Sequence, residues 1–419
     1  MIKILATSDW HLGNTFHGFD RQEEHADFLR WLLGAVGQKN PDALLVSGDI
    51  FDSSNPSAAS QELYYSFLDT LTQRFPQLQT IIIAGNHDSA ARLEAPRLML
   101  ERHRVYVRGL IRGQEEGNFL PDDLLLPVCS AAHPEERAWV LAVPYLRDGD
   151  FTRGMSYGEG VGEFLRRAVE AANLRRDRSR EALILMAHLY ATGSEIAENS
   201  SERIVIGGSE MVSLDEIDES VTLALLGHLH RNQKVSGREN WLYPGSALPM
   251  SFAEKGYRHG AVYYEIEDGR LNGVSEFLDY PLQHPLVSVP AKPLPLTEVL
   301  DLLRALPDKD KMSEEEPVPY LEVNVLLDAP VAGINKQVED VLQSKNVRLC
   351  RTVIAYRVQQ SAGDGEVVLE SVDDLLTLDP IEVIRKSYQN KFRCEMRDEL
   401  VELARRAVGS GSQGRRQMN

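Results

Sequence analysis

Residues 2–11 read IKILATSDWH, and this stretch decides the fold. Residues 2–6 form a short, largely apolar run that is typical of a buried strand, and Asp9 and His11 follow it directly. These two side chains lie on the same side of an extended segment because they are two residues apart. Two potential metal ligands therefore leave the end of one strand together, where open α/β sheets place their sites.

The same arrangement recurs along the chain. Short β-branched or leucine-rich runs predict five further strands, at residues 44–46, 81–83, 140–143, 183–186 and 223–226. Polar clusters follow four of them: Gly48-Asp49-Ile50-Phe51-Asp52, Gly85-Asn86-His87-Asp88, His188, and Gly227-His228-Leu229-His230. Apolar residues with helical spacing lie between several strands, around residues 28–33, 63–71 and 164–169. The chain is therefore α/β up to about residue 180 and strand-rich from there to residue 264.

The residue types in these clusters indicate a metal centre. Carboxylate, amide and neutral imidazole groups together suit divalent metals of intermediate hardness such as manganese, with zinc or iron as alternatives. The seven candidate ligands are Asp9, His11, Asp49, Asn86, His188, His228 and His230. Seven ligands are more than one ion needs, and with one bridging carboxylate they fit two ions roughly 3.5–4 Å apart.

Each cluster alone has a plainer interpretation. A lone histidine after a strand is more often a core or turn residue, and Gly-Asp or Gly-Asn pairs are commonly turns. Five clusters in this order, each at a strand end, make coincidence a poor explanation. Glycine before Asp49, Asn86 and His228 is expected to let the chain turn sharply out of the sheet.

Size and composition agree with a globular protein of more than one domain. The 419 residues are 43% hydrophobic and 26% charged, which suffices for a well-buried core. The formal charge of −18 argues mildly against nucleic-acid binding, although metal ions or a basic partner can supply positive charge. The three cysteines are widely separated, so reduced structural thiols are expected. No apolar run approaches a membrane span, and we expect a cytoplasmic, nucleoid-associated protein.

The motif order DxH, GDxxD, GNHD, His and GHxH resembles the calcineurin-like metallophosphoesterases. Further stretches resemble one branch, the SbcD family of bacterial double-strand-break-repair nucleases: Pro144-Tyr145-Leu146-Arg147, Pro244-Gly245-Ser246 and Ser251-Phe252. This resemblance implies an α/β metallophosphoesterase sandwich, in which two mixed sheets are flanked by helices. It also implies a small α/β capping domain and a C-terminal helical tail.

Site roles follow from the same resemblance. It implies two divalent ions, most readily Mn²⁺, one bound by Asp9, His11 and His230, the other by Asn86, His188 and His228, with Asp49 bridging both. His87 is then a catalytic residue and not a ligand: it stabilises charge on the phosphoryl oxygens or protonates the leaving oxygen.

Asp52 departs from the pattern of archaeal and eukaryotic relatives, which often have a second histidine at this place. The residue resembles instead the phosphatase pattern, in which this aspartate pairs with the histidine of GNH, and so predicts an Asp52–His87 dyad. The alternative is a carboxylate that caps the loop at residues 53–56. Weaker candidates for substrate binding adjoin the ligands, namely Tyr190, Arg231 and Asn232. The arginines at 166–167 and 175–180 fit a solvated helix face better than a DNA contact.

The organisation changes after residue 280. Alternating strand-like and helical segments predict a βαβαβ unit at 284–358, which the SbcD resemblance makes a capping domain for DNA-end selection. A helical region at 368–408 carries an apolar stripe that must be covered. It packs on its own domain or docks on a partner, and the resemblance favours docking on SbcC, an SMC-like ATPase. Residues 409–419 are expected to be a flexible tail.

The predicted function is therefore a Mn-dependent DNA nuclease subunit. The resemblance implies 3'-5' double-strand exonuclease and single-strand or hairpin endonuclease activity, in DNA repair, recombination and replication, and a homodimer of nuclease subunits. Two alternatives remain open: a stand-alone phosphatase or cyclic-nucleotide phosphodiesterase with the same two-metal site, and a scaffold that recruits the ATPase and cuts little.

Overall fold

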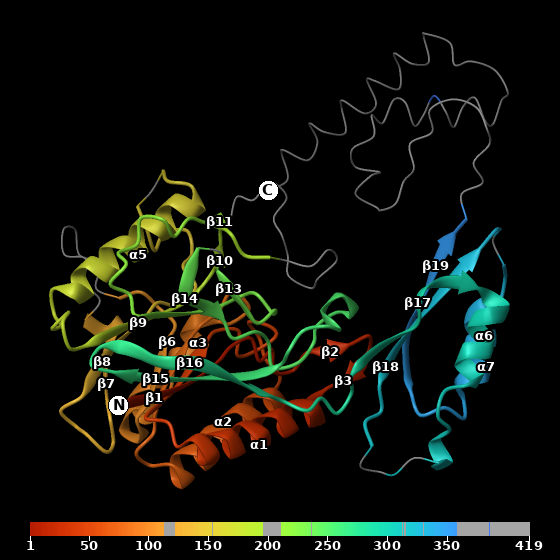
Figure 1. The fold of residues 1–419 in the computed structure, drawn as a ribbon, viewed down its shortest axis with the longest axis horizontal. Helices are drawn as coiled ribbons and strands as arrows, with labels where there is room; N and C mark the ends of the chain where they lie inside the picture. The colour runs from red at the N-terminus through yellow and green to blue at the C-terminus, as the bar shows by residue number, and fades with distance from the viewer. Residues whose placement is uncertain are drawn as a thin grey trace. The chain divides into compact units, whose positions relative to one another are not determined.

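Two six-stranded sheets form the body of the molecule (Figure 1). The structure is a computed structural model that describes residues 1–112, 122–152, 154–195, 211–235, 237–311, 313, 316–329, 331–357 and 385. Buried side chains from both sheets, such as Ile4, Ile81, Val140 and Ile184, share one hydrophobic cluster. The sheets are therefore packed face to face as a sandwich.

The first sheet has the strand order β16-β15-β1-β4-β5-β6. Strands β1, β4, β5 and β6 are parallel, whereas β15 is antiparallel to β1 and to β16. The bounds are β1 (Ile2–Thr7), β4 (Ala43–Ser47), β5 (Gln79–Ile83), β6 (Val105–Arg108), β15 (Gly260–Glu267) and β16 (Arg270–Asp279). The N-terminal strand thus lies in the middle of the sheet, beside a strand from far along the chain.

The second sheet has the order β13-β14-β12-β9-β8-β7. Its four central strands are parallel, and the edge strands β13 and β7 are antiparallel to their neighbours. The bounds are β7 (Leu125–Cys129), β8 (Arg137–Ala142), β9 (Ala182–His188), β12 (Leu223–Gly227), β13 (Gln233–Val235) and β14 (Arg238–Tyr243). Every residue of β9 and β12 is buried, as expected for strands covered on both faces.

Helices cover the outer faces of the sandwich. Helices α1 (Gln22–Lys39) and α2 (Ala58–Arg74) pack on the first sheet, and α5 (Tyr157–Asn173) packs on the second. Helix α5 begins with a capping box, in which Ser156 and Glu159 satisfy each other's backbone N–H groups. Short elements complete this part: β2 (Thr15–Phe16), β3 (Phe19–Asp20), α3 (Ala90–Glu94), α4 (Arg97–Leu100), β10 (Tyr190–Ala191), β11 (Met211–Val212) and the 3-10 turn η3 (Phe252–Glu254).

A separate three-stranded parallel sheet follows, in the order β17-β18-β19. Its chain order is β17 (Leu286–Pro295), α6 (Leu296–Arg304), β18 (Tyr320–Leu327), α7 (Ile334–Leu342) and β19 (Arg348–Tyr356). Both helices pack on the sheet through a core of its own that includes Val299, Val323 and Val338. This is the βαβαβ order that the sequence predicts.

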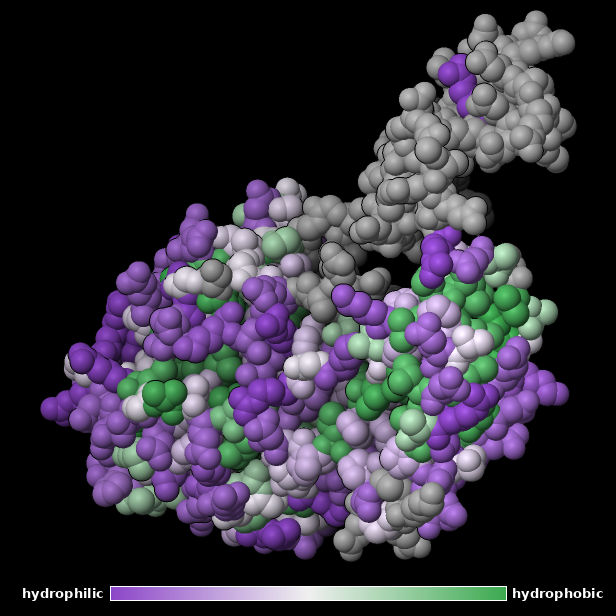
Figure 2. Space-filling view, turned by 45° about the vertical axis from the view of Figure 1, so that its right-hand side comes forward, coloured by the Kyte–Doolittle hydropathy of each residue, from purple (hydrophilic) through white to green (hydrophobic). Residues whose placement is uncertain are grey.

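The predicted fold class is confirmed: two mixed sheets flanked by helices, with an additional small α/β unit. The sequence patterns missed β6, β7 and β16, and they predicted β13, β14 and the first part of β15 only as a strand-rich stretch without individual bounds. The predicted helical region at 368–408 and the tail at 409–419 lie outside the described residues, except for Arg385. Hydrophilic side chains cover most of the face seen in Figure 2, and hydrophobic ones lie among them in separate patches. Among the described helices, none has the length and apolar character to cross a bilayer.

Candidate metal centre

The seven predicted ligands leave strand ends in both sheets of the sandwich. Those from the first sheet follow β1, β4 and β5; those from the second end β9 or follow β12. The first group is Asp9, His11, Asp49 and Asn86, and the second is His188, His228 and His230. Parallel strands direct their carboxyl ends to one edge of a sheet, so the two sheets together place all seven side chains at one place.

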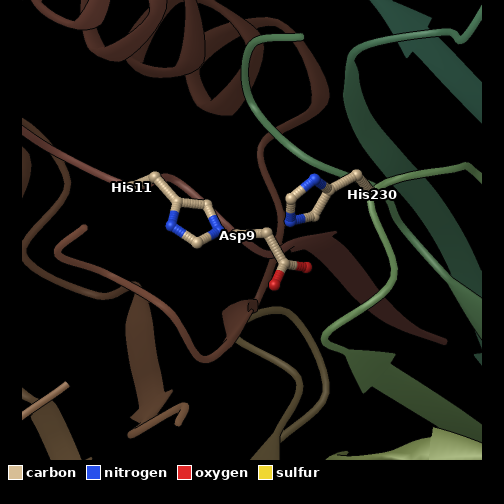
Figure 3. Close-up of side chains that lie close together, drawn as sticks. All are labelled: Asp9, His11 and His230. Atoms are coloured by element: carbon tan, nitrogen blue, oxygen red, sulfur yellow. The ribbon is translucent and has the colours of Figure 1, made fainter. Parts of the chain in front are cut away.

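Asp9, His11 and His230 form the first cluster. One potential ligand atom from each lies within 4.8 Å of the other two, and all three residues are buried. Figure 3 shows the three side chains converging, although His230 comes from the other sheet. The rings of His11 and His230 meet edge to face with centroids 5.1 Å apart.

Asn86, His188 and His228 form the second cluster. The Oδ1 atom of Asn86 lies 2.9 Å from Nε2 of His188 and 3.1 Å from Nδ1 of His228. Asp49 lies between the clusters, since its Oδ2 atom is 3.4 Å from His188 Nε2 and 3.7 Å from His11 Nε2. The Asp49 carboxylate therefore faces both clusters, as a bridging ligand must.

The donor set fits divalent cations. Buried polar atoms without a hydrogen-bond partner include Oδ2 of Asp9 and Nε2 of His11, and a cation in the first cluster would satisfy both. Oxygen and imidazole donors without thiolate match metals of the manganese, iron or zinc class.

The backbone at the site has unusual conformations. Four ligands have positive φ values, which non-glycine residues rarely adopt: 50° at Asp9, 48° at His11, 48° at Asp49 and 101° at His228. Each such residue costs about 1–3 kcal/mol unless the surroundings hold it in place. Strain of this kind clusters at functional sites, and four of the eight described non-glycine residues with positive φ are residues that the sequence predicts as ligands.

Asp88 holds together two of the loops that carry candidate ligands. Its buried carboxylate accepts hydrogen bonds from the backbone N–H groups of Ile50 (3.1 Å), Phe51 (3.0 Å) and Gly85 (2.9 Å). The loop after β4 is thereby fixed to the loop after β5. The last residue of the GNHD motif thus has a structural role that the sequence did not reveal.

The glycines of the motifs act in two different ways. Gly48 has a φ of 92° and turns the chain sharply, as predicted. Gly227 has no positive φ; instead, a Cβ atom there would collide with the carbonyl oxygen of Ser47 and with the ring of His188. Close approach of the two sheets, and not backbone rotation, requires glycine at this position.

Neighbouring side chains of the site shift one another's pKa values. Burial lowers the pKa of His188, but the adjacent Asp49 carboxylate outweighs this effect and raises that pKa to about 9. Burial opposes ionisation of Asp49 too, and yet the His188 charge and hydrogen bond hold its pKa well below the usual range. His228 differs, because burial and the nearby His188 charge lower its pKa to about 3. In the absence of metal, His188 therefore carries the proton that pairs with Asp49.

His87 lies beside the two clusters and is exposed. Its backbone N–H donates to Oδ1 of Asp49 (2.9 Å), and its ring meets that of His11 edge to face at 4.9 Å. The Nδ1 atom of His87 lies 2.9 Å from the main-chain carbonyl oxygen of Asp52. A carbonyl oxygen can only accept, so Nδ1 carries a hydrogen and Nε2 remains directed away from this contact.

The carboxylate of Asp52 has a different partner from the one predicted. It lies 3.5 Å from Nδ1 of His11 and accepts a hydrogen bond from the Asn14 amide (3.1 Å). Burial raises the pKa of Asp52, but the contacts with His11 and Asn14 hold it below the usual range. Asp52 thus contacts His87 through its main-chain carbonyl oxygen. Its carboxylate lies 3.5 Å from Nδ1 of the candidate ligand His11 and also within 4.8 Å of a ring nitrogen of His87. Its part in catalysis stays a prediction, and this geometry favours support of His11.

The weaker candidates have structural partners. Arg231 forms an ion pair with Glu195 at 2.5 Å, and the Asn232 amide donates to the carbonyl oxygens of Tyr243 and Pro244. Tyr190 is half-buried at the start of β10. Substrate binding by these residues stays a prediction.

The arginines around helix α5 also have partners. Arg166 pairs with Glu163 and Glu170 on the same helix, and Arg178 pairs with Asp218. These contacts agree with the solvated helix face that the sequence favours.

Sequence reasoning missed Glu254. This residue is fully buried, and its Oε1 atom lies 3.4 Å from Nδ1 of His230. An acidic residue two positions after Phe252 was the only signal in the sequence, and its spacing relates it to no other ligand.

Comparison with known proteins agrees with the geometry. Residues 2–232 match the calcineurin-like phosphoesterase family, and residues 283–392 match the family described as the type 5 capsule protein repressor C-terminal domain. The SbcD subunit of the nuclease SbcCD from Rhodobacter capsulatus is 35% identical over 362 residues, which cover 84% of this chain and 87% of the relative. The corresponding protein of Escherichia coli K12 is 27% identical over 368 residues, covering 83% and 84%. A solved dimetal phosphatase from Danio rerio is 12% identical, with a TM-score of 0.40 over 67% of this chain and 99% of that one.

Proposed function

The chain belongs to the calcineurin-like phosphoesterase family, in the branch of the SbcD nuclease subunits, and from this premise we propose that it cleaves DNA as the nuclease subunit of an SbcCD-type complex. It is a metal-dependent phosphodiester hydrolase. The observation that supports the proposal is the convergence of seven candidate ligands from two sheets, with His87 exposed beside them. A phosphate at this place can meet both metal clusters and the imidazole at once.

The proposed ligand sets follow the two clusters. Asp9, His11 and His230 would hold one ion, Asn86, His188 and His228 would hold the other, and Asp49 would contribute to both. Two such ions would supply Lewis-acid activation of water and of the phosphate oxygens. We propose Mn²⁺, because mixed carboxylate, amide and imidazole ligands suit it.

His87 is the proposed catalytic imidazole. Its exposed ring can donate to a phosphoryl oxygen or to the leaving oxygen of the sugar. The Asp52 carbonyl oxygen fixes the ring orientation through Nδ1, which leaves Nε2 for the substrate. Asp49 positions the same residue through its backbone N–H.

We further propose 3'-5' exonuclease activity on duplex ends and endonuclease activity on single strands and hairpins, in DNA repair, recombination and replication. The relatives bear the name of a nuclease subunit of SbcCD, which supports a nuclease in a complex with an SbcC-like ATPase. Residues 284–358 are the proposed capping domain for DNA ends. The proposed docking region for the ATPase, 368–408, lies outside the described residues. A homodimer of nuclease subunits is part of the proposal.

A direct assay tests the choice of substrate. The full chain with Mn²⁺ is incubated with linear duplex DNA, a DNA hairpin and a small aryl phosphodiester, with an EDTA-treated sample as control. We expect metal-dependent cleavage of DNA. Rapid turnover of the small ester with intact DNA, both alone and with the ATPase partner, would instead identify a stand-alone phosphodiesterase.

A further inference from the structure

Glu254 stands directly behind one of the metal ligands. The side chain is fully buried, and its Oε1 atom lies 3.4 Å from Nδ1 of His230. Its carboxylate also accepts hydrogen bonds from the backbone N–H of Met250 (2.8 Å) and the Ser251 hydroxyl (3.2 Å). A buried carboxylate with these partners keeps a fixed position, and that position faces the imidazole.

The orientation of His230 explains what Glu254 does. With Nδ1 facing Glu254, the other edge of the ring faces the cluster with Asp9 and His11 (Figure 3). An imidazole that binds a metal through Nε2 must carry its hydrogen on Nδ1, and a carboxylate behind it selects this tautomer and fixes the ring. We propose that Glu254 is a positioning residue that holds His230 in place as a metal ligand, and that Tyr320 of the small α/β unit stabilises it there.

Two other ligands have acceptors at the equivalent place. Nδ1 of His11 faces the Asp52 carboxylate at 3.5 Å, and Nδ1 of His188 lies 2.9 Å from the carbonyl oxygen of Ser47. Glu254 is the third acceptor of this set. The cluster of Asp9, His11 and His230 therefore has a carboxylate behind each of its two imidazoles, whereas the other cluster has a neutral carbonyl behind His188.

The segment that carries Glu254 is held by a buried arginine. Arg21 is fully buried and donates from Nη1 to the carbonyl oxygen of Pro249 at 2.6 Å. Its Nε and Nη2 atoms donate to the two carboxylate oxygens of Glu24, at 3.0 and 3.2 Å. Glu24 in turn accepts a hydrogen bond from the Tyr320 hydroxyl at 2.7 Å. A continuous series of hydrogen bonds thus links β18 to residue 249.

Aromatic packing links the same two places. Phe252, at the start of η3, packs on Phe16 with ring centroids 5.5 Å apart, and Phe16 packs on Tyr320 at 4.9 Å. The three residues form one buried cluster. Residues 249–254 therefore contact Arg21 at one end and His230 at the other, with Phe252 between them. Loss of the Tyr320 contact should loosen the turn and, through Glu254, the ligand His230.

Metal binding tests this inference. Mn²⁺ is titrated by calorimetry into the EDTA-stripped full chain, and the EPR spectrum of bound Mn²⁺ reports the ligand field. Glu254→Gln should weaken one of the two binding events by about 10- to 100-fold, the usual effect of losing such a partner, and leave the other within about twofold. Glu94→Gln is the matched control, because Glu94 is equally buried but contacts Arg97, Arg112 and the backbone of residues 109 and 110.

The second variant tests the link to the small unit. Tyr320→Phe removes one hydroxyl and should weaken the same binding event by about fivefold at most, which corresponds to the loss of one net hydrogen bond. Tyr320→Phe should cause no further loss of Mn²⁺ affinity in a Glu254→Gln background, because both substitutions act on the same candidate ligand, His230. Tyr356→Phe on β19, where the tyrosine is 53% exposed, is the control.

Unchanged Mn²⁺ affinities and an unchanged EPR spectrum in a folded Glu254→Gln protein would overturn the inference. Equal weakening of both ions would do the same. If circular dichroism shows that the Glu254→Gln protein does not fold, Glu254→Asp is measured instead. Aspartate keeps the negative charge, but its shorter side chain places the carboxylate farther from His230. The inference rests on the proposed metal ligands and not on DNA as substrate, so binding of Mn²⁺ tests it whichever ester is cleaved.

Discussion

Replacement of His87 by alanine should separate metal binding from catalysis. The structure gives this ring one side-chain hydrogen bond, from Nδ1 to the Asp52 carbonyl oxygen, and leaves the residue exposed. Its loss should therefore cost about 1 kcal/mol of stability, or roughly 2–4 °C in Tm for a domain of this size. The cleavage rate should fall far more, by about 10²–10⁴-fold, because a positioned acid or donor at the phosphate is lost.

Single-turnover cleavage of a labelled DNA duplex at saturating Mn²⁺ measures the rate, and calorimetry of the stripped protein measures both ions. His133→Ala is the control, since this side chain is 59% exposed and pairs with Glu135, away from the seven ligands. Two Mn²⁺ ions should still bind to the His87 variant with unchanged affinity. Cleavage within tenfold of the unmodified protein would refute the catalytic role. Loss of one ion would make His87 a ligand.

Three further outcomes follow from the site. Asp52→Asn should weaken Mn²⁺ binding by about 10- to 100-fold, because His11 loses the carboxylate beside it, and the acidic limb of the pH–rate profile should not move. A shifted acidic limb with unchanged Mn²⁺ binding would instead support the Asp52–His87 dyad. The raised pKa of His188 means that the metal-free fold holds this proton more tightly than the unfolded chain. The stabilisation of the fold by this proton is complete below pH 6.5 and is lost as the pH rises toward about 9. The Tm of EDTA-treated protein should therefore fall across that pH range, and the affinity for Mn²⁺ should rise. A Tm and an affinity that stay constant with pH would contradict this prediction. Gly227→Ala should lower the free energy of unfolding by about 1–3 kcal/mol and weaken metal binding, because the added Cβ collides with Ser47. Chemical denaturation measures the free energy of unfolding. An unchanged value would show that the two sheets can separate locally.

The sequence predicted the part of this molecule that repeats a simple pattern. An apolar strand followed by a polar cluster places Asp9 or His188 at a strand end, whatever happens in the rest of the chain. The residue types then indicate a metal, because carboxylate and imidazole side chains rarely gather for packing alone. Fold class and ligand candidates thus depend on local signals.

The residues that support the ligands could not be found in this way. Glu254 and Asp52 act on His230 and His11 through contacts across the fold, and the sequence holds no spacing rule for such pairs. Asp52 also shows the limit of analogy: the residue stands where the family pattern expects a partner for His87, but its carboxylate lies beside His11. The strands that were missed, such as β6 and β7, are short runs without a polar cluster to mark their ends.

The position of β1 in the first sheet has a consequence for protein synthesis. Strand β1 pairs with β15, whose last residue is Glu267, and the ligand set that starts with Asp9 is complete only at His230. At about 5–20 residues per second, a ribosome needs roughly 10 to 50 s to synthesise the chain from β1 to the end of β15. A nascent or prematurely terminated chain that ends before His230 therefore lacks part of the candidate metal site, and we expect phosphodiester hydrolysis only once translation has passed the end of the sandwich.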